Sequence, residues 1–199
     1  HSHYYKQMTG LLQPLPGAVE LLQDHGETMS PEDRRRFLDN AGADTARLSL
    51  LVTRLLDLAR ADMARPETDV AANILAPLRR AADAVVGRGV KVTLDLPDDA
   101  PLAAVPEATL DTVFSVLFQN SRQAVAALVV VTLHETPDAI QLRISDDGPG
   151  VPAGDRDRLF DPFFTSRRSE GGTGLGLSIA RSLLAASHGA ILLVDSDGG

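Results

Sequence analysis

The stretch GGTGLGLSIA, residues 171–180, places four glycines directly before an apolar run that is typical of a buried helix. A helix N-terminus carries unpaired N–H groups and a partial positive charge, and it therefore attracts anions. Glycines just before it let the backbone approach phosphate oxygens, because no Cβ stands in the way. The stretch therefore predicts a phosphate-binding turn, although a glycine-rich turn that only permits close packing has the same pattern.

The composition narrows the class of protein. The chain has 199 residues, of which 44% are apolar, a formal charge of −8 and no cysteine. This is an ordinary globular composition for one or two domains, and no apolar run is long enough to span a bilayer. The acidic balance and the lack of tryptophan argue against a nucleic-acid partner. The absence of cysteine excludes disulfides and thiolate metal sites, and it fits a reducing compartment without proving one.

The character of the chain changes near RPETD, residues 65–69. The preceding part, residues 1–66, has only helical patterning, with a break before Ser30 and Pro31, which are suited to the N-cap and first position of a helix. A helix from Pro31 to about Ala64 would be ~50 Å long. We expect an antiparallel helical hairpin that dimerises into a four-helix bundle; the alternative is a hairpin that packs on its own second domain.

The second part, residues 67–199, alternates short strands with helices. The expected helices cover residues 74–86, 107–127 and 175–189, and the expected strands cover residues 90–96, 128–134, 139–147 and 190–196. This order predicts an α+β chain whose second domain is an α/β sandwich, with a mixed sheet and its helices on one face. Helix and strand meet almost directly in AVAALVVVTL, so we expect either a very tight loop or missing residues, and we expect a fragment.

Three more motifs carry polar chemistry. In ISDDGPGVP, residues 144–152, a strand ends in a carboxylate and two glycines, which suits a flat ring with an exocyclic amine or a simple turn. In LFQNSRQA, residues 117–124, a half-apolar helix carries amides, one of which could be an oxygen ligand for Mg²⁺. In RLFDPFFTSRR, residues 158–168, aromatic residues precede an arginine pair that could meet a terminal phosphate.

The order and close spacing of these motifs resemble the ATP-binding domain of sensor histidine kinases, a Bergerat fold shared with other GHKL ATPases. QNSRQA resembles the N box, DDGPG the first G box, LFDPFF the F box and GGTGLGL the second G box. The resemblance implies that Asn120 coordinates Mg²⁺ on the ATP phosphates and that Asp146 accepts a hydrogen bond from the adenine amine. The other positions it assigns to ATP binding are Gln123, Gly148, Gly150, Phe160, Phe164, Arg167, Arg168, Gly172, Thr173, Gly174, Leu175 and Gly176.

The helical half resembles the dimerisation and phosphoacceptor domain of the same family, but the acceptor motif departs from the pattern. His3 is the candidate phosphoacceptor, and Tyr4 stands where the family has an acid that activates the histidine. A second register puts Lys6 at the histidine position instead. Gln7 stands four residues after His3, where the family uses a side chain that orients a water for dephosphorylation.

The resemblance thus implies a homodimeric kinase that transfers phosphate from Mg·ATP to a histidine and then to an aspartate of a response-regulator receiver domain. It also implies a phosphatase activity toward the regulator, and a sensor or membrane part elsewhere in the full-length protein. Two alternatives stay open. One is a degenerate kinase that only binds nucleotide and regulator, and the other is a different GHKL protein kinase.

Overall fold

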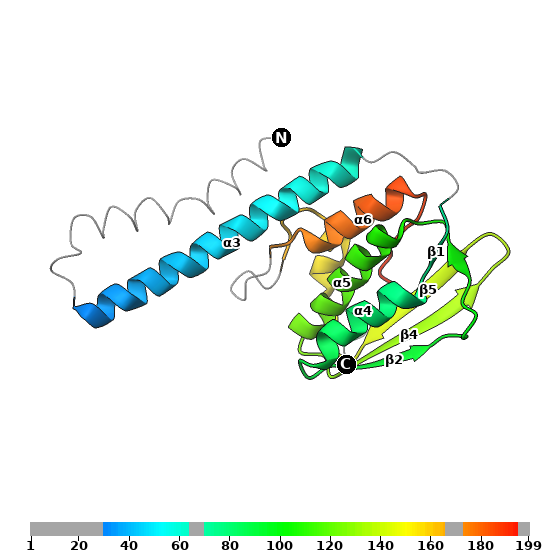
Figure 1. The fold of residues 1–199 in the computed structure, drawn as a ribbon, viewed down its shortest axis with the longest axis horizontal. Helices are drawn as coiled ribbons and strands as arrows, with labels where there is room; N and C mark the ends of the chain where they lie inside the picture. Colours follow the sequence, from blue (N-terminus) through cyan, green and yellow to red (C-terminus); the bar gives the residue numbers. More distant parts are fainter. Residues whose placement is uncertain (1–29, 64–69, 166–172, 195–199) are drawn as a thin grey trace.

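The computed structural model describes residues 30–63, 70–165 and 173–194, and Figure 1 shows the arrangement of their elements. A long helix, α3 (Pro31–Met63), precedes a unit in which strands and helices alternate. α3 lies along the last helix, α6 (Gly176–Ala186), and extends beyond it (Figure 1). The first helix of the predicted hairpin lies outside the described residues, so the structure tests only its second helix.

The start of α3 follows from local capping chemistry. Ser30 Oγ accepts a hydrogen bond from the Asp33 N–H at 3.1 Å and donates one to the Asp33 carboxylate at 2.7 Å. The first bond satisfies one of the N–H donors that a helix N-terminus leaves unpaired, the second holds the Ser30 side chain in place, and Pro31 stands where its missing N–H costs nothing. The predicted start is confirmed, and α3 is helical up to Met63; the predicted end at about Ala64 lies outside the described residues. No helix in the described part of the chain is long and apolar enough to cross a membrane.

The predicted mixed sheet is confirmed. Its order is β2 (Lys91–Asp95), β4 (Leu128–Glu135) and β5 (Ile140–Asp146). β2 runs parallel to β4, whereas β4 and β5 form an antiparallel hairpin. A separate two-stranded ladder pairs β1 (Ala72–Asn73) with β3 (Leu102–Ala103). The parallel pair requires a crossover connection, and α5 (Glu107–Gln123), which lies between β2 and β4 in the chain, provides it.

One face of the sheet is covered by α4 (Leu75–Val86), α5 (Glu107–Gln123) and α6, so the unit has two layers (Figure 1). Val129 and Val131 of β4 point into this interface and are fully buried, as is Phe118 of α5. Burying side chains of this size is worth about 1.5–3 kcal/mol each. Along β2 and β5, half-buried residues alternate with exposed ones, which is the alternation expected of a sheet packed on one side.

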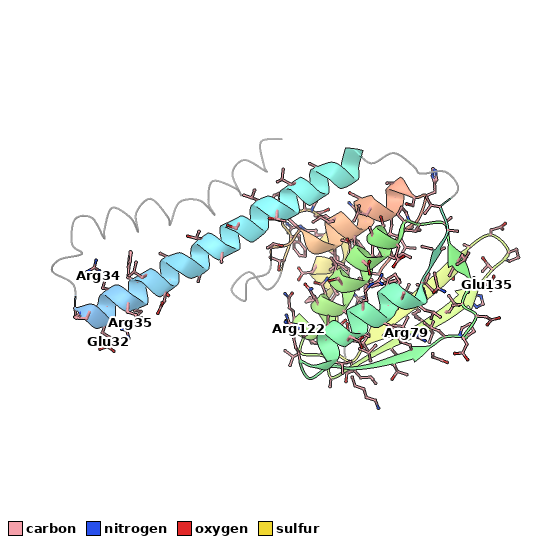
Figure 2. The ribbon with its side chains drawn as sticks, viewed as in Figure 1. Glu32, Arg34, Arg35, Arg79, Arg122 and Glu135 are labelled. Atoms are coloured by element: carbon pink, nitrogen blue, oxygen red, sulfur yellow. The ribbon has the colours of Figure 1, made fainter. Side chains whose placement is uncertain are left out.

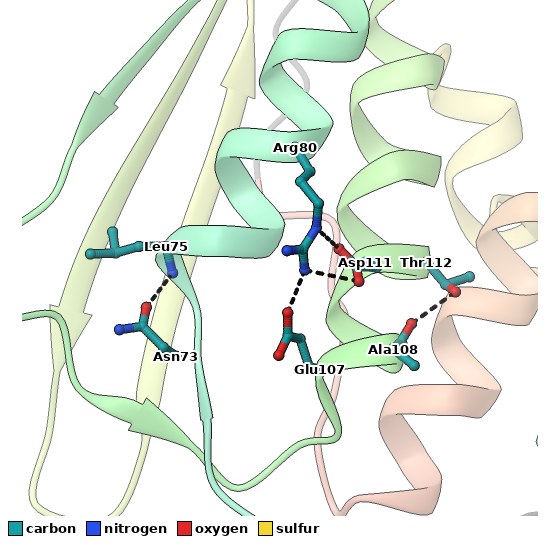
Figure 3. A network of polar contacts seen from close by, with 7 residues as sticks. All are labelled: Asn73, Leu75, Arg80, Glu107, Ala108, Asp111 and Thr112. Carbon is teal, nitrogen blue, oxygen red and sulfur yellow. Dashed lines mark hydrogen bonds and ion pairs between the residues drawn. The ribbon is translucent and has the colours of Figure 1, made fainter.

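A polar brace joins α4 to α5 on the outer surface of the helical layer. Figure 3 shows Arg80 reaching both acids: it donates to Asp111 Oδ1 at 2.8 Å and to Glu107 Oε1 at 2.6 Å. The hydrogen bond to Asp111, and then that to Glu107, raise the pKa of Arg80 further above its ordinary value. All three side chains are about half exposed. Solvent screening therefore limits what this brace contributes to stability.

The connector between α5 and β4 is only four residues long, and it ends the helix earlier than predicted. The N–H of Ala126 donates to the Ser121 carbonyl at 3.1 Å, and the N–H of Val125 donates to the Arg122 carbonyl at 3.0 Å. This pair of bonds is a Schellman motif, in which the residue after the helix takes a left-handed conformation. Val125 does so, with φ 58°. The predicted continuation of the helix to Ala127 is therefore wrong.

The predicted strand at residues 190–196 is also not observed in its described part, and residues 195 and 196 lie outside the described residues. Residues 190–194 have no regular secondary structure, and within the described residues β5 pairs only with β4. Leu192 and Val194 are largely exposed. Alternating apolar residues are not enough to make a strand, because a strand also needs a ladder partner for its backbone N–H and C=O groups.

Candidate functional site

The last turn of α5, the end of β5 and the first turn of α6 come together at one end of the sandwich. Figure 2 shows Arg122, near the end of α5, at the opposite end of the unit from Glu135, the last residue of β4. A hydrogen bond from Ser121 to Asp146 ties α5 to the end of β5. The described motifs that the sequence singled out all converge on this end.

Asp146 is held by two donors from different elements. Ser121 Oγ donates to its Oδ2 at 2.6 Å, and the Gly148 N–H donates to its Oδ1 at 3.0 Å. A carboxylate offers about four lone-pair positions, so two acceptor positions remain open. The Asp146 side chain is exposed. It is therefore an oriented acceptor that can still receive a hydrogen bond from a ligand.

The neighbouring carboxylate, Asp147, is used by the backbone. Its Oδ1 accepts hydrogen bonds from the N–H groups of Leu128 at 2.9 Å and Ala127 at 2.8 Å. Both hydrogen bonds lower the pKa of Asp147 below its ordinary value, and the bond from Leu128 has the larger effect. Asp147 thus holds the end of the tight α5–β4 connector. Of the two adjacent acids, Asp147 serves the connector, and Asp146 is the one that α5 orients.

Gly148 allows the chain to pass close to this carboxylate. A Cβ at position 148 would lie 2.8 Å from Asp146 Oδ1 and 3.2 Å from the Ala124 Cβ. Any larger residue would displace the carboxylate or the end of α5. Gly150 follows with φ 72°, so the chain turns sharply away from β5.

Asn120 lies on the face of α5 that meets α6. It is one turn beyond Val116, and residues four apart share a helix face. Val116 contacts the start of α6, since a Cβ at Gly176 would lie 3.1 Å from Val116 Cγ1. The amide of Asn120 is half-buried and has no hydrogen-bond partner among the described residues. Gln123, by contrast, is exposed at the end of α5.

The first turn of α6 is free to hold an anion. No side chain caps the helix at Leu175, which is fully buried. Thr173 Oγ1 accepts a long hydrogen bond of 3.4 Å from the Leu175 N–H, and the Ser178 hydroxyl donates back to the Leu175 carbonyl. The N–H groups that follow Leu175 keep the partial positive charge of the helix end. The predicted helix after the glycines is therefore confirmed, and phosphate binding by this turn stays a prediction.

The turn at Gly174, before α6, packs on the aromatic segment at Phe163 and Phe164 through the backbone. Gly174 has φ 70°, and a Cβ there would lie 2.5 Å from the Phe163 carbonyl carbon and 2.7 Å from the Phe164 carbonyl oxygen. Only glycine fits such a crossing, because both the conformation and the space exclude a side chain. Phe163 is buried and also has a positive φ, 65°. The aromatic segment is thereby fixed against the start of α6.

Two arginines lie over phenylalanines that the sequence singled out, although the sequence assigned no role to the arginines themselves. The Arg158 guanidinium lies 4.5 Å from the Phe164 ring centre, and that of Arg181 in α6 lies 5.7 Å from the Phe160 ring centre. Cation–π contacts of this kind are worth about 0.5–1 kcal/mol at exposed sites. They anchor both phenylalanines. The position of Arg158, two residues before FDPFF, could have suggested the first contact, whereas nothing near Arg181 in the sequence points to the second.

Two more side chains near the site also had no role in the sequence analysis. The Ser121 hydroxyl is buried against Asp146, and the Nε of Arg122 is buried with no hydrogen-bond partner among the described residues. The predicted residues His3, Lys6, Gln7, Arg167, Arg168 and Gly172 lie outside the described residues. In the described part of the chain no three His, Asp or Glu side chains form a metal site. A bound cation would therefore have to take most of its ligands from elsewhere.

The comparisons with known proteins match this chain to histidine kinases and to the ATPase family that includes them. Residues 106–199 match the family model of histidine kinase-, DNA gyrase B- and HSP90-like ATPases. The probable sensor histidine kinase TcrY of Mycobacterium tuberculosis is 33% identical over 198 residues, which cover 94% of this chain and 41% of TcrY. The chain thus spans well under half of that relative.

Two solved structures are similar over almost the whole chain. Full-length ShkA in complex with AMPPNP has a TM-score of 0.60 and 25% identity, covering 93% of this chain and 40% of ShkA. The histidine kinase ThkA in complex with the response regulator protein TrrA has a TM-score of 0.70, covering 100% of this chain and 58% of ThkA. At 17% identity the second likeness shows the fold alone.

Proposed function

Since this chain carries the ATP-binding domain of the histidine kinase family over residues 106–199, we propose that it is the catalytic core of a two-component sensor histidine kinase. The domains of the proposal are residues 1–66, for dimerisation and phosphotransfer, and residues 67–199, for ATP binding. The observation that carries it is the meeting of the open acceptor on Asp146 with the uncapped N-terminus of α6. The first suits an adenine amine and the second suits phosphates.

In the proposed complex, Asp146 accepts a hydrogen bond from the exocyclic amine of adenine. The glycines at 148 and 150 leave room for the ring, while the N–H groups after Leu175, with Thr173 and the neighbouring glycines, hold the phosphates. Phe160 and Phe164 anchor the segment that leads to Arg167 and Arg168, one of which faces the γ-phosphate.

Asn120 is the proposed protein ligand for Mg²⁺. Its amide oxygen is a hard donor, and its helix face leads to the start of α6. Mg²⁺ usually keeps waters and takes further oxygens from substrate phosphates. A single amide ligand therefore fits a cation that enters with ATP, and the cation would neutralise charge on the phosphates. Gln123 is left as a candidate for a sugar or phosphate contact.

The proposed acceptor is His3. An imidazole nitrogen attacks the γ-phosphorus, a new N–P bond forms, the bond to the bridging oxygen breaks and ADP leaves. The phosphoryl group then passes to an aspartate of a response regulator. Tyr4 is a poor base at neutral pH, so His3 must be activated by another group. Lys6 is the alternative in the second register, and Gln7 would orient a water for dephosphorylation of the regulator.

The proposed assembly is a homodimer on the cytoplasmic side, with a sensor part elsewhere in the full-length protein. α3 supports it, because Leu38, Val52 and Leu56 are exposed on this helix. Apolar residues spaced along a helix commonly meet a second helix. The regulator partner is proposed from the relatedness to sensor histidine kinases; ThkA, which shares the fold, is itself solved in complex with the response regulator protein TrrA.

Incubation of the full chain with Mg²⁺ and γ-labelled ATP tests the proposal. We expect an acid-labile label on the wild type that is absent from His3→Ala and from Asn120→Ala. His134→Ala is the matched control, since this histidine is exposed near the end of β4, away from the site, and its label should be unchanged. A label that persists in His3→Ala and is lost in a Lys6 variant would favour the second register.

The degenerate-kinase alternative rests on the acid that is missing beside His3. It predicts that the wild type binds Mg·ATP with micromolar to millimolar affinity but acquires no label. Acid-stable label on a separate protein would instead favour another GHKL kinase. Lack of nucleotide binding by the wild type would refute all three.

A further inference from the structure

We propose that Ser121 is a positioning residue for base recognition: its hydroxyl fixes the orientation of Asp146 and thereby sets the preference of the site for adenine. The inference rests on the proposed role of Asp146 in nucleotide binding. Ser121 does not contact the base itself. It acts on the Asp146 carboxylate, because a neighbouring group must hold the rotation of this carboxylate if its open lone pairs are to point toward the base.

The hydroxyl proton of Ser121 has two acceptors within reach, and distance decides between them. Oγ lies 2.6 Å from Asp146 Oδ2 and 3.3 Å from the Leu117 carbonyl oxygen. Hydrogen bonds to carboxylates are shorter and about twice as strong as neutral ones. The single proton therefore goes to Asp146. Because Ser121 is only 3% exposed, water does not replace it.

The backbone of Ser121 is itself fixed, so the hydroxyl is a stationary donor. Its carbonyl accepts the N–H of Ala126 in the Schellman motif that ends α5. The next connector residues, Ala127 and Leu128, donate to Asp147. The two adjacent acids thus have linked tasks: Asp147 secures the helix end, and the helix end presents the donor that orients Asp146.

With both of its donors, Asp146 is held at both oxygens. The Gly148 N–H is close in sequence to Asp146, and alone it would fix one oxygen and leave the carboxylate free to rotate about it. Ser121 supplies the second point, from an element 25 residues away. A carboxylate held at two points discriminates a purine that carries a 6-amino donor from one that lacks it. A base without the amine would cover a carboxylate oxygen of Asp146 and leave it without a hydrogen bond, which is costly.

The experiment compares two nucleotides by calorimetry on the full chain with Mg²⁺: a non-hydrolysable ATP analogue and the matching purine riboside analogue without the 6-amino group. We expect Ser121→Ala to weaken the adenine nucleotide about five- to tenfold, since hydrogen bonds to charged groups exceed neutral ones in strength. It should leave the purine nucleotide nearly unchanged. Ser121→Thr, which restores a hydroxyl, should recover the adenine preference, and Asp146→Asn should abolish it.

Ser115→Ala is the matched control, since this serine lies on the same helix and its hydroxyl accepts a hydrogen bond from Gln119, outside the site. Its ratio of affinities should equal that of the wild type. Equal weakening of both nucleotides by Ser121→Ala would overturn the inference, because it would mean a general effect on the fold. So would an undiminished adenine preference. A wild type that bound neither nucleotide would refute the proposed function, and the inference with it.

Discussion

Replacing Val125 by glycine should stabilise the protein, although the change removes a side chain. Val125 follows α5 with φ 58°, the left-handed conformation that ends a Schellman motif. An L-residue pays about 1–2 kcal/mol for this conformation, and a β-branched residue is especially rare there. Glycine adopts it without a steric cost.

Two smaller terms oppose this gain. The Val125 side chain is 88% exposed. Burial of a whole valine is worth about 1.5–3 kcal/mol, so its remaining contacts contribute only about 0.2–0.4 kcal/mol. Glycine also loses about 0.5–1 kcal/mol more backbone entropy on folding. The balance of the central values is a net stabilisation of about 0.5 kcal/mol.

Urea unfolding followed by circular dichroism measures this balance, and hydrogen exchange of the β4 amides assigns it to the α/β unit. The matched control is Ala127→Gly, an exposed position in the same connector without a positive φ. It should destabilise by about 0.5–1 kcal/mol, because only the entropy cost applies. If Val125→Gly destabilised the chain as much as Ala127→Gly, the argument from backbone strain would be refuted.

Gly174→Ala should lower both the nucleotide affinity and the unfolding midpoint, because its Cβ would meet the Phe163 backbone at 2.5 Å. Calorimetry measures both quantities, and Gly154→Ala, whose Cβ would have nothing within 4 Å, is the control. Equal effects of the two substitutions would contradict the prediction. The pKa of Asp147 is lowered in the folded state, so its contribution to stability is present above the ordinary Asp pKa of about 4 and is lost as the pH falls through the folded pKa. Urea unfolding at pH 6 and pH 3 should therefore show a smaller loss of stability for Asp147→Asn than for the wild type, and an equal loss would refute this role. Phe118→Ala should lower the free energy of unfolding by about 3–5 kcal/mol, since the Phe118 ring is fully buried in the core. Thermal unfolding measures this change. A loss under about 1 kcal/mol would contradict the prediction and show that the core relaxes around the missing ring.

Features that depend on nearby residues could be predicted from the sequence. The start of α3 needs only Ser30, Pro31 and Asp33, which lie within one turn. The order of strands and helices followed from periodicity, and the motif that contains Asp146 and Gly148 came to lie at a strand end as expected. In these cases the chemistry that decides the structure is local.

What failed depended on partners distant in sequence. The run QAVAA has good helix formers and no glycine or proline, so it predicts a longer helix than the one observed. The helix stops because the connector is bonded to Asp147, about twenty positions later. Ser121 was missed for the same reason: its partner is Asp146 on another element, and a serine near a helix end is unremarkable by itself.

The contact between Ser121 and Asp146 has a thermodynamic consequence. These residues are 25 positions apart and meet only when the ends of α5 and β5 come together, so the proposed nucleotide site is not assembled in the unfolded chain. A ligand of this site binds the native state alone, and mass action then shifts the folding equilibrium toward it. At a free nucleotide concentration of one hundred times Kd the shift is about 2.7 kcal/mol. The resistance of this domain to heat and to proteases should therefore rise and fall with the concentration of nucleotide around it.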